Sequence, residues 1–363
     1  MIPDLPLIEH DHRLARLRAS MNCRSVDSFL TSDSASLRWL SGFTGSAGKL
    51  MVTDAGTYLL TDGRYAEQAE KQTQSTQIEI LVGGLDHQKD LIADYLQGLR
   101  TVALEADRVT WLEAEELRES LSSQVVSTPG IVSDLRRSKE SAEIVRIEAA
   151  ASVADGALSE LRSELGNKPT EIEFARALDQ AMYDGGAEGL SFETICASGP
   201  NAALPHARPS TRVIKSGDLV ILDFGALVDG YHSDMTRTFV IGESDERSWA
   251  MVNAVTDAQE LGYQALRPGV EASEVDAACR SHLANLGLAD HFVHGTGHGV
   301  GLEIHEAPWI NALSETILEE GQVVTVEPGV YRPGFGGVRV EDTVLITATG
   351  ARRLTSAPKD PLI

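Results

Sequence analysis

One stretch of the chain, VILDFGALVDGYHSDMTRTFV over residues 220–240, restricts the fold more than any other. Asp229-Gly230 near its centre is a strong signal for a two-residue hairpin turn, because both turn positions require positive φ. With that turn, Asp223 lies opposite Thr236, and Asp234 lies on the same face as Asp223, about 7–8 Å away. Two carboxylates on one face of an apolar hairpin repel each other and lose hydration. The hairpin therefore predicts a metal cation between them.

Three later segments supply groups that bind metals. The segment HGTGHGVGLEIHE, residues 294–306, spaces three histidines by four and seven residues in a glycine-rich loop. Glu327 follows an apolar run, and Glu341 lies within a strand-like run over 337–346. Two Asp, two Glu and one His form an oxygen-rich set that suits Mn²⁺, Co²⁺, Fe²⁺ or Zn²⁺. Four carboxylates against two divalent ions leave room for a bridging hydroxide, so two ions fit better than one.

Together these segments resemble the proline-specific pita-bread metallopeptidases, the Xaa-Pro aminopeptidases and Xaa-Pro dipeptidases (prolidases). The resemblance covers nearly the whole chain, and the family's Asp, Asp, His, Glu and Glu ligands occur in order. It implies that two divalent ions, with Mn²⁺ as the first candidate, are held by Asp223, Asp234, His298, Glu327 and Glu341. It also implies that three histidines hold the substrate and stabilise the tetrahedral intermediate, namely His206, His294 and His305. Arg339 matches an arginine that supports a metal-bound carboxylate.

The resemblance implies hydrolysis of the Xaa-Pro bond at the N-terminus of peptides that carry proline at the second position. A hydroxide bridging two metals is a nucleophile at neutral pH, because coordination lowers the pKa of water to roughly 7 for zinc. We expect the metal and His305 to stabilise the oxyanion, and Glu327 to carry the proton to the departing proline nitrogen. His206 and His294 are expected to contact the proline side of the substrate or its carbonyl. The related methionine aminopeptidases have no histidine that resembles His294, which favours proline specificity.

The expected fold class is α/β (α+β), in two domains. A length of 363 residues favours two domains. The resemblance implies a smaller creatinase/prolidase-like domain at 1–130 and a pseudo-symmetric pita-bread catalytic domain at 138–363. In the first domain the patterns predict strands at 25–30, 49–53, 57–61, 78–82 and 101–105, and helices at 12–21, 66–72, 89–99 and 111–121. In the second they predict helices at 141–165, 171–183, 247–266 and 272–286.

Composition excludes several function classes. The formal net charge of −23, from 54 acidic and 31 basic residues, argues against nucleic acid or an anionic membrane as a partner. Cys23, Cys196 and Cys279 are far apart in the sequence and form no CxxC pair, so we expect no disulfide framework. The first residues lack the apolar segment of a signal peptide, and no apolar run is long enough to span a membrane. We expect a cytoplasmic protein and, from the resemblance, a homodimer.

Several alternatives remain at this point. GFTGSAG and TDGRY in the first domain resemble aminopeptidase P more than prolidase. An Xaa-Pro dipeptidase is nevertheless the alternative activity, because the choice depends on what closes the cleft beyond the scissile bond. A metal-free creatinase-like hydrolase and an inactive binding module on the same fold are more remote. The complete five-ligand set argues against both.

Overall fold

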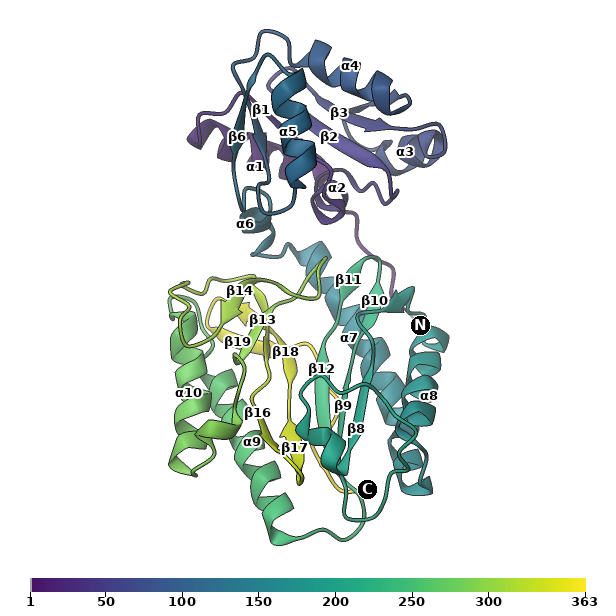
Figure 1. Ribbon diagram of the computed structural model, residues 1–363, viewed down its shortest axis with the longest axis vertical. Coiled ribbons are helices and arrows are strands. Elements are labelled where there is room, and N and C mark those ends of the chain that lie inside the picture. Colours follow the sequence, from purple (N-terminus) through teal and green to yellow (C-terminus); the bar gives the residue numbers. More distant parts are fainter. Residues whose placement is uncertain (1) are drawn as a thin grey trace. The chain divides into compact units, whose positions relative to one another are not determined.

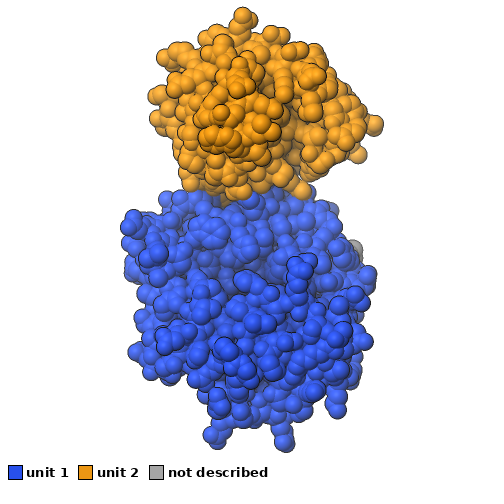
Figure 2. Space-filling model, viewed as in Figure 1, with its two compact units in different colours: residues 1–6, 137–363 blue, residues 7–136 orange. Residues whose placement is uncertain are grey.

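The computed structural model describes residues 2–363 (Figure 1). The chain divides into two compact units, which Figure 2 colours separately: Leu7–Arg136, and residues up to Pro6 together with Arg137–Ile363. Within residues 2–363, no helix combines the length and the apolar character that crossing a bilayer requires.

The N-terminal unit is built on a six-stranded mixed sheet with the order β4-β3-β2-β1-β5-β6. Its strands are β1 Ser28–Thr31, β2 Gly48–Thr53, β3 Thr57–Thr61, β4 Ile78–Val82, β5 Thr101–Leu104 and β6 Gln124–Ser127. Its helices are α1 His10–Cys23, α2 Ser34–Ser41, α3 Ala66–Thr73, α4 Leu85–Tyr95, α5 Trp111–Ser120 and α6 Ser133–Arg136. One core cluster forms where apolar residues of α4 and α5 pack on the sheet, which buries Leu60, Ile92 and Leu117.

Most of the predicted elements of this unit are confirmed, with two omissions. The sequence did not predict α2 or β6, and it placed the start of α4 four residues too late. Helix α2 begins after Asp33, whose side chain accepts a hydrogen bond from Ser36 N, and it ends at Gly42, where φ is +77°. A helix of eight residues is too short to display a convincing 3.6-residue period.

Glu105 follows β5 and is almost fully buried. Its carboxylate accepts hydrogen bonds from Thr31 Oγ1 at 2.5 Å and from Ser36 Oγ at 2.9 Å. Burial raises the pKa of Glu105 to about 7, although both hydroxyl donors act in the opposite direction. This unit therefore contains a carboxyl group that favours the protonated state when folded.

We expect Glu105→Gln to remove a pH dependence of stability. The folded pKa lies above the unfolded value, so stabilisation that is full below about pH 4.5 is lost as the pH rises through about 7. The free energy of unfolding of the variant should exceed that of the wild type by up to about 3 kcal/mol above pH 7, and match it near pH 4.5. Urea titrations of the full chain at several pH values measure this difference. The control is Glu119→Gln in α5, an exposed position; parallel curves for wild type and Glu105→Gln would contradict the expectation.

The C-terminal unit contains two blocks, each with two helices followed by antiparallel strands. The helices are α7 Ser141–Leu161, α8 Glu171–Asp184, α9 Glu246–Ala265 and α10 Ala272–Asn285. The strands are β7 Gly189–Leu190, β8 Ile195–Ser198, β9 Leu219–Phe224, β10 Ala226–Val228, β11 Tyr231–His232, β12 Met235–Val240, β13 Gly297–Gly299, β14 Glu306–Ile310, β15 Val323–Val326, β16 Gly329–Arg332, β17 Gly336–Arg339, β18 Asp342–Thr347 and β19 Gly350–Arg353. The helices lie outside and the strands meet at the centre (Figure 1). This repetition agrees with the expected pseudo-symmetric α/β fold.

The hairpin is confirmed down to its register. Asp229 and Gly230 have φ values of +45° and +73°, and Asp223 pairs with Thr236. The strands are interrupted at Gly225, where an added Cβ would lie 2.0 Å from the carbonyl oxygen of Ser233. Because of this interruption, β10 and β11 pair beyond the break, while β9 and β12 form a sheet with β8. Asp234 lies at the break, immediately before β12.

The glycine-rich histidine segment is partly a strand and not only a loop. Its centre is β13, which lies between β14 and β15 in a five-stranded sheet. A Cβ on Gly297 would lie 2.1 Å from Thr325 O, and one on Gly299 would lie 2.4 Å from Ala307 O. These two glycines therefore permit the close approach of neighbouring backbones, which a side chain would prevent.

Candidate active site

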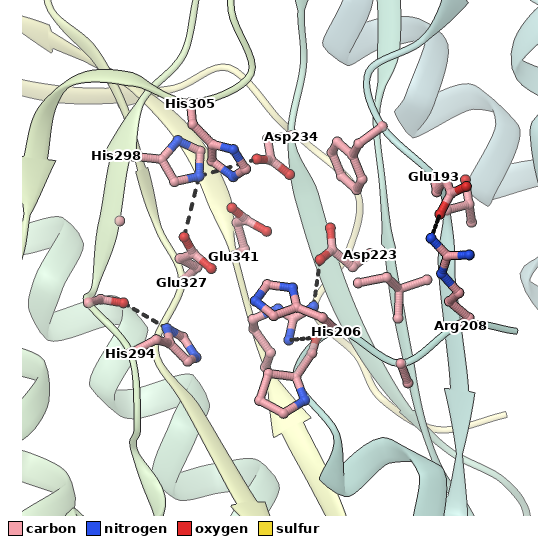
Figure 3. A pocket seen from close by; sticks show the side chains of 18 of the residues that line it. Glu193, His206, Arg208, Asp223, Asp234, His294, His298, His305, Glu327 and Glu341 are labelled. Atoms are coloured by element: carbon pink, nitrogen blue, oxygen red, sulfur yellow. Dashed lines mark hydrogen bonds and ion pairs between the residues drawn. The ribbon is translucent and has the colours of Figure 1, made fainter. Parts of the chain in front are cut away.

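The C-terminal unit contains a cavity of about 760 Å³ between its two blocks of strands. All the site residues predicted from the sequence line it: His206, Asp223, Asp234, His294, His298, His305, Glu327, Arg339 and Glu341 (Figure 3). The structure thus brings together side chains from β9, β13, β17 and the ends of β12, β15 and β18.

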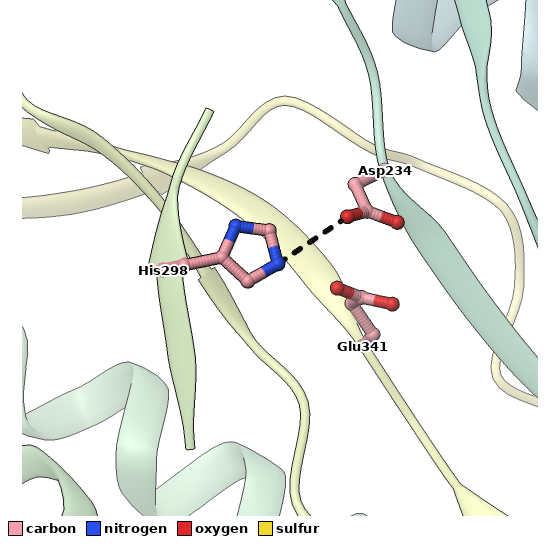
Figure 4. Close-up of side chains that lie close together, drawn as sticks. All are labelled: Asp234, His298 and Glu341. Atoms are coloured by element: carbon pink, nitrogen blue, oxygen red, sulfur yellow. Dashed lines mark ion pairs between the residues drawn. The ribbon is translucent and has the colours of Figure 1, made fainter. Parts of the chain in front are cut away.

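Three of these residues form a compact group suited to a metal ion. One ligand atom from each of Asp234, His298 and Glu341 lies within 4.8 Å of the other two (Figure 4). Asp234 precedes β12, His298 lies in β13 and Glu341 precedes β18. All three side chains are buried. The first block contributes Asp234 and the second block contributes the other two.

The histidine of this group directs a lone pair at carboxylate oxygens. Its Nδ1 lies 3.0 Å from Gly299 O, which places the proton on Nδ1. Its Nε2 lies 3.6 Å from Asp234 Oδ2 and 3.4 Å from Glu327 Oε1. Burial lowers the pKa of His298 to about 4, so the ring is neutral at pH 7. A neutral lone pair facing two carboxylates is unfavourable unless a cation lies between them.

The carboxylates show the same need for a cation. Burial and repulsion from neighbouring carboxylates raise the pKa of Asp234 and of Glu341 well above the ordinary range. Burial likewise raises the pKa of Glu327 to about 8. Within residues 2–363, the buried oxygens Asp223 Oδ1 and Glu341 Oε1 have no hydrogen-bond partner. Buried polar atoms normally have partners, and divalent cations would supply them here. The residues present therefore fit a metal centre.

Arg339 supports two of the acidic residues. It is buried, and its Nη2 donates to Asp223 Oδ2 at 2.5 Å. Its Nε donates to Thr236 Oγ1 at 3.1 Å, and that hydroxyl donates to Glu341 Oε2 at 2.6 Å. One guanidinium group thereby fixes the carboxylate of Asp223 directly and that of Glu341 through Thr236.

A hydrogen-bonded chain connects His294 to the same arginine. His294 Nδ1 lies 2.7 Å from Gly295 O, and His294 Nε2 lies 2.9 Å from the hydroxyl of Tyr331. Arg339 Nη1 donates to that hydroxyl at 2.8 Å, so the Tyr331 proton points at His294 Nε2. Burial lowers the pKa of His294 to about 4. Both ring nitrogens of His294 are therefore occupied within the protein, and Tyr331 mediates its contact with the site.

The sequence interpretation did not single out Tyr331. The signal was present in EPGVY, where a tyrosine in an apolar strand follows Glu327 by four residues. A buried tyrosine hydroxyl requires a hydrogen-bond partner, so such a residue beside a ligand candidate points into the site.

The structure places His305 beside the metal group. The His305 ring centre lies 4.4 Å from that of His298, with the planes at 74°. The next residue, Glu306, accepts from Lys139 Nζ at 2.8 Å in an ion pair with both side chains buried. The sequence gave no indication of this pair, because Lys139 precedes α7 and the two residues are far apart in the chain. The pair fixes the backbone next to His305.

Asp342, adjacent to Glu341, is fully buried and forms ion pairs. Burial alone would raise its pKa, but Arg237 and Lys359 outweigh burial and lower the pKa to about 2. Arg237 Nη2 lies 2.8 Å from Asp342 Oδ1, and Lys359 Nζ lies 2.6 Å from Oδ2. The start of β18 is held in place by these pairs, which positions Glu341.

Comparison with known proteins gives consistent results. The model of metallopeptidase family M24 matches residues 145–348, and that of the creatinase/prolidase N-terminal domain matches residues 13–138. An Xaa-Pro dipeptidase of Pyrococcus furiosus is 36% identical over 352 residues, which cover 96% of this chain and 99% of the relative. The solved structure of an Xaa-Pro dipeptidase from Bacillus anthracis has a TM-score of 0.94 and 37% identity, covering 98% of this chain and 100% of that one. An X-Pro aminopeptidase structure from Thermotoga maritima has a TM-score of 0.88 and 32% identity, covering 96% and 99%.

Proposed function

Because this chain belongs to metallopeptidase family M24, we propose that it is a dinuclear metallo-exopeptidase that hydrolyses the Xaa-Pro bond, preferentially in dipeptides. The observation that carries this proposal is the neutral His298 with its lone pair directed at Asp234 and Glu327 in a cavity lined by three more histidines. The catalytic role belongs to the domain predicted at 138–363.

The names of the relatives support the preference for dipeptides. The sequence favoured an aminopeptidase, with a dipeptidase as the alternative. The Pyrococcus furiosus and Bacillus anthracis relatives are both named Xaa-Pro dipeptidase, whereas the Thermotoga maritima relative is named an aminopeptidase. The Xaa-Pro aminopeptidase is therefore our second candidate.

Five side chains would hold the two ions, namely Asp223, Asp234, His298, Glu327 and Glu341. When bound, divalent ions supply a water that is acidic enough to be a nucleophile at neutral pH, and they polarise the scissile carbonyl. The oxygen-rich set is compatible with Mn²⁺, which we propose as the first candidate. Arg339 acts as a positioning residue, because it holds the Asp223 carboxylate at 2.5 Å.

The protein's own groups would orient the substrate and move protons. Burial lowers the pKa of His305, so its neutral ring can donate an N–H to the carbonyl before proline as negative charge develops there. Glu327, which lines the cavity, would carry a proton to the proline nitrogen. That nitrogen belongs to a tertiary amide and must be protonated to leave. His206 would contact the proline side of the substrate.

The proposal is tested by hydrolysis of Ala-Pro, Ala-Pro-Ala and Ala-Ala by the purified protein, after chelation and after addition of Mn²⁺. We expect metal-dependent cleavage of the two proline peptides, with the higher kcat/KM for Ala-Pro, and little cleavage of Ala-Ala. A higher kcat/KM for Ala-Pro-Ala would favour the aminopeptidase. Cleavage that is insensitive to chelation, or no cleavage of either proline peptide, would refute the proposal.

Two further properties belong to the same proposal. The three cysteines are free, which supports a reducing, cytoplasmic location. The homodimer that the resemblance implies can be tested by light scattering at several protein concentrations.

A further inference from the structure

One wall of the cavity is a short segment bounded by two prolines, Pro205 and Pro209. Proline fixes φ, so both ends of the segment are restrained. Between them, Ala207 is buried in an apolar cluster that includes Ile195 and Tyr331. His206 and Arg208 on either side of Ala207 are exposed. His206 and Arg208 both line the cavity.

Arg208 is the exposed arginine among the residues that line this cavity. The residues that line it include only two permanently charged cations, Arg208 and Arg339. Arg339 is buried and donates to Asp223, Thr236, Tyr331 and Pro205 O, so its donors are already used. Arg208, in contrast, has a largely exposed side chain.

The partner of Arg208 is itself exposed. Arg208 Nη2 lies 3.1 Å from Glu193 Oε2, and the two side chains are 84% and 79% exposed. In the view of Figure 3, this pair lies on the opposite side of the cavity from His294 and His298. An exposed ion pair contributes little to stability, so another carboxylate can replace Glu193 at small cost.

We propose that Arg208 binds the free α-carboxylate of the proline in an Xaa-Pro dipeptide, displacing Glu193. This inference rests on the proposed function and names the residue that would select dipeptides. The carboxylate of such a dipeptide is two bonds from the scissile nitrogen, so it enters the cavity with the reacting bond. A guanidinium group binds carboxylate through two parallel hydrogen bonds. A longer peptide carries an uncharged amide at that place and leaves the Glu193–Arg208 pair closed.

The test compares Ala-Pro with Ala-Pro-amide, which has the same shape and no carboxylate. In Arg208→Gln, the ratio of kcat/KM for Ala-Pro to that for the amide should fall about tenfold or more, mainly through a higher KM for Ala-Pro. Arg208→Lys should restore part of the ratio, because lysine keeps the charge without the planar pair of donors. Glu193→Gln should raise the ratio, because it removes the competing carboxylate. Metal content and the melting temperature of each variant check that the site is intact.

Two results would overturn the inference about Arg208. One is an unchanged ratio in Arg208→Gln, and the other is a wild-type protein that cleaves the amide and Ala-Pro-Ala but not Ala-Pro. Either result would still be compatible with hydrolysis of Xaa-Pro bonds by this protein. Failure of the wild type on all three proline substrates would instead refute the proposed function.

Discussion

Asp234→Asn is expected to lose bound divalent metal and nearly all peptidase activity. Asparagine keeps the shape of the side chain but removes the charge that would balance a cation held between Asp234, His298 and Glu341. Substitutions of residues that only support ligands cost 10–100-fold in metal affinity, so removal of a ligand should weaken binding by at least about 100-fold. We expect kcat/KM to fall by about 10³-fold or more, because the attacking water depends on the metal.

Although Asp234→Asn should abolish activity, it should stabilise the metal-free protein. The pKa of Asp234 is raised by burial, and then by Glu341, Asp223 and Glu327. For a carboxyl group whose folded pKa is raised, stabilisation is present at low pH and is lost as the pH rises. Metal-free Asp234→Asn should therefore be more stable than metal-free wild type at pH 8.

Elemental analysis, steady-state kinetics and urea unfolding with and without chelator measure the three effects. The matched control is Asp229→Asn, the same change in the hairpin turn, where Asp229 pairs with Arg146 at 2.7 Å and does not line the cavity. Asparagine also tolerates the positive φ of that position. Normal metal content in Asp234→Asn, or a less stable metal-free variant, would count against the cation site.

The second large effect is expected from His294→Ala, which should retain metal and lose about 10²-fold in kcat. His294 is the hydrogen-bond acceptor for the Tyr331 hydroxyl, and Tyr331 in turn accepts from Arg339, which holds Asp223. Removal of the imidazole leaves that buried hydroxyl without its acceptor. We expect kcat to fall more than KM rises, because the disturbed groups position the reacting centre.

Tyr331→Phe distinguishes the two ways in which His294 could act. If His294 acts through the hydroxyl, Tyr331→Phe should reproduce most of the loss while leaving the imidazole in place. If Tyr331→Phe stays near wild type while His294→Ala is impaired, the imidazole touches the substrate itself. His291→Ala, a histidine three residues earlier that does not line the cavity, is the control. Loss of metal in His294→Ala would show a structural role instead.

The elements that the sequence predicted well are those determined by neighbouring residues. The register of the hairpin follows from two residues that accept positive φ, Asp229 and Gly230. The start of α8 follows from Thr170 and Glu173, whose side chains cap it reciprocally. In both cases a few adjacent residues contain the whole interaction, so no distant partner has to be known.

What the sequence did not reveal depends on partners far apart in the chain. Strand β13 was taken for a loop, because its glycines are explained only by the backbones of Thr325 and Ala307 against which they pack. The pairing of Lys139 with Glu306 likewise exists only after the fold has brought the two segments together. Resemblance to a family supplied the convergence of the ligand residues, which spacing alone did not.

The three residues of the metal group come from both blocks of the C-terminal unit. This arrangement has a consequence for the lifetime of the protein. Asp234 belongs to the first block, and His298 and Glu341 to the second, so an extended chain offers no equivalent chelate. An ion that binds only the folded chain stabilises it by about 2.7 kcal/mol when its free concentration is 100 times its Kd. Proteases cleave the opened chain, and they do so in proportion to its population when opening is fast. The supply of free metal would then govern how slowly this protein is degraded, independently of how much substrate it meets.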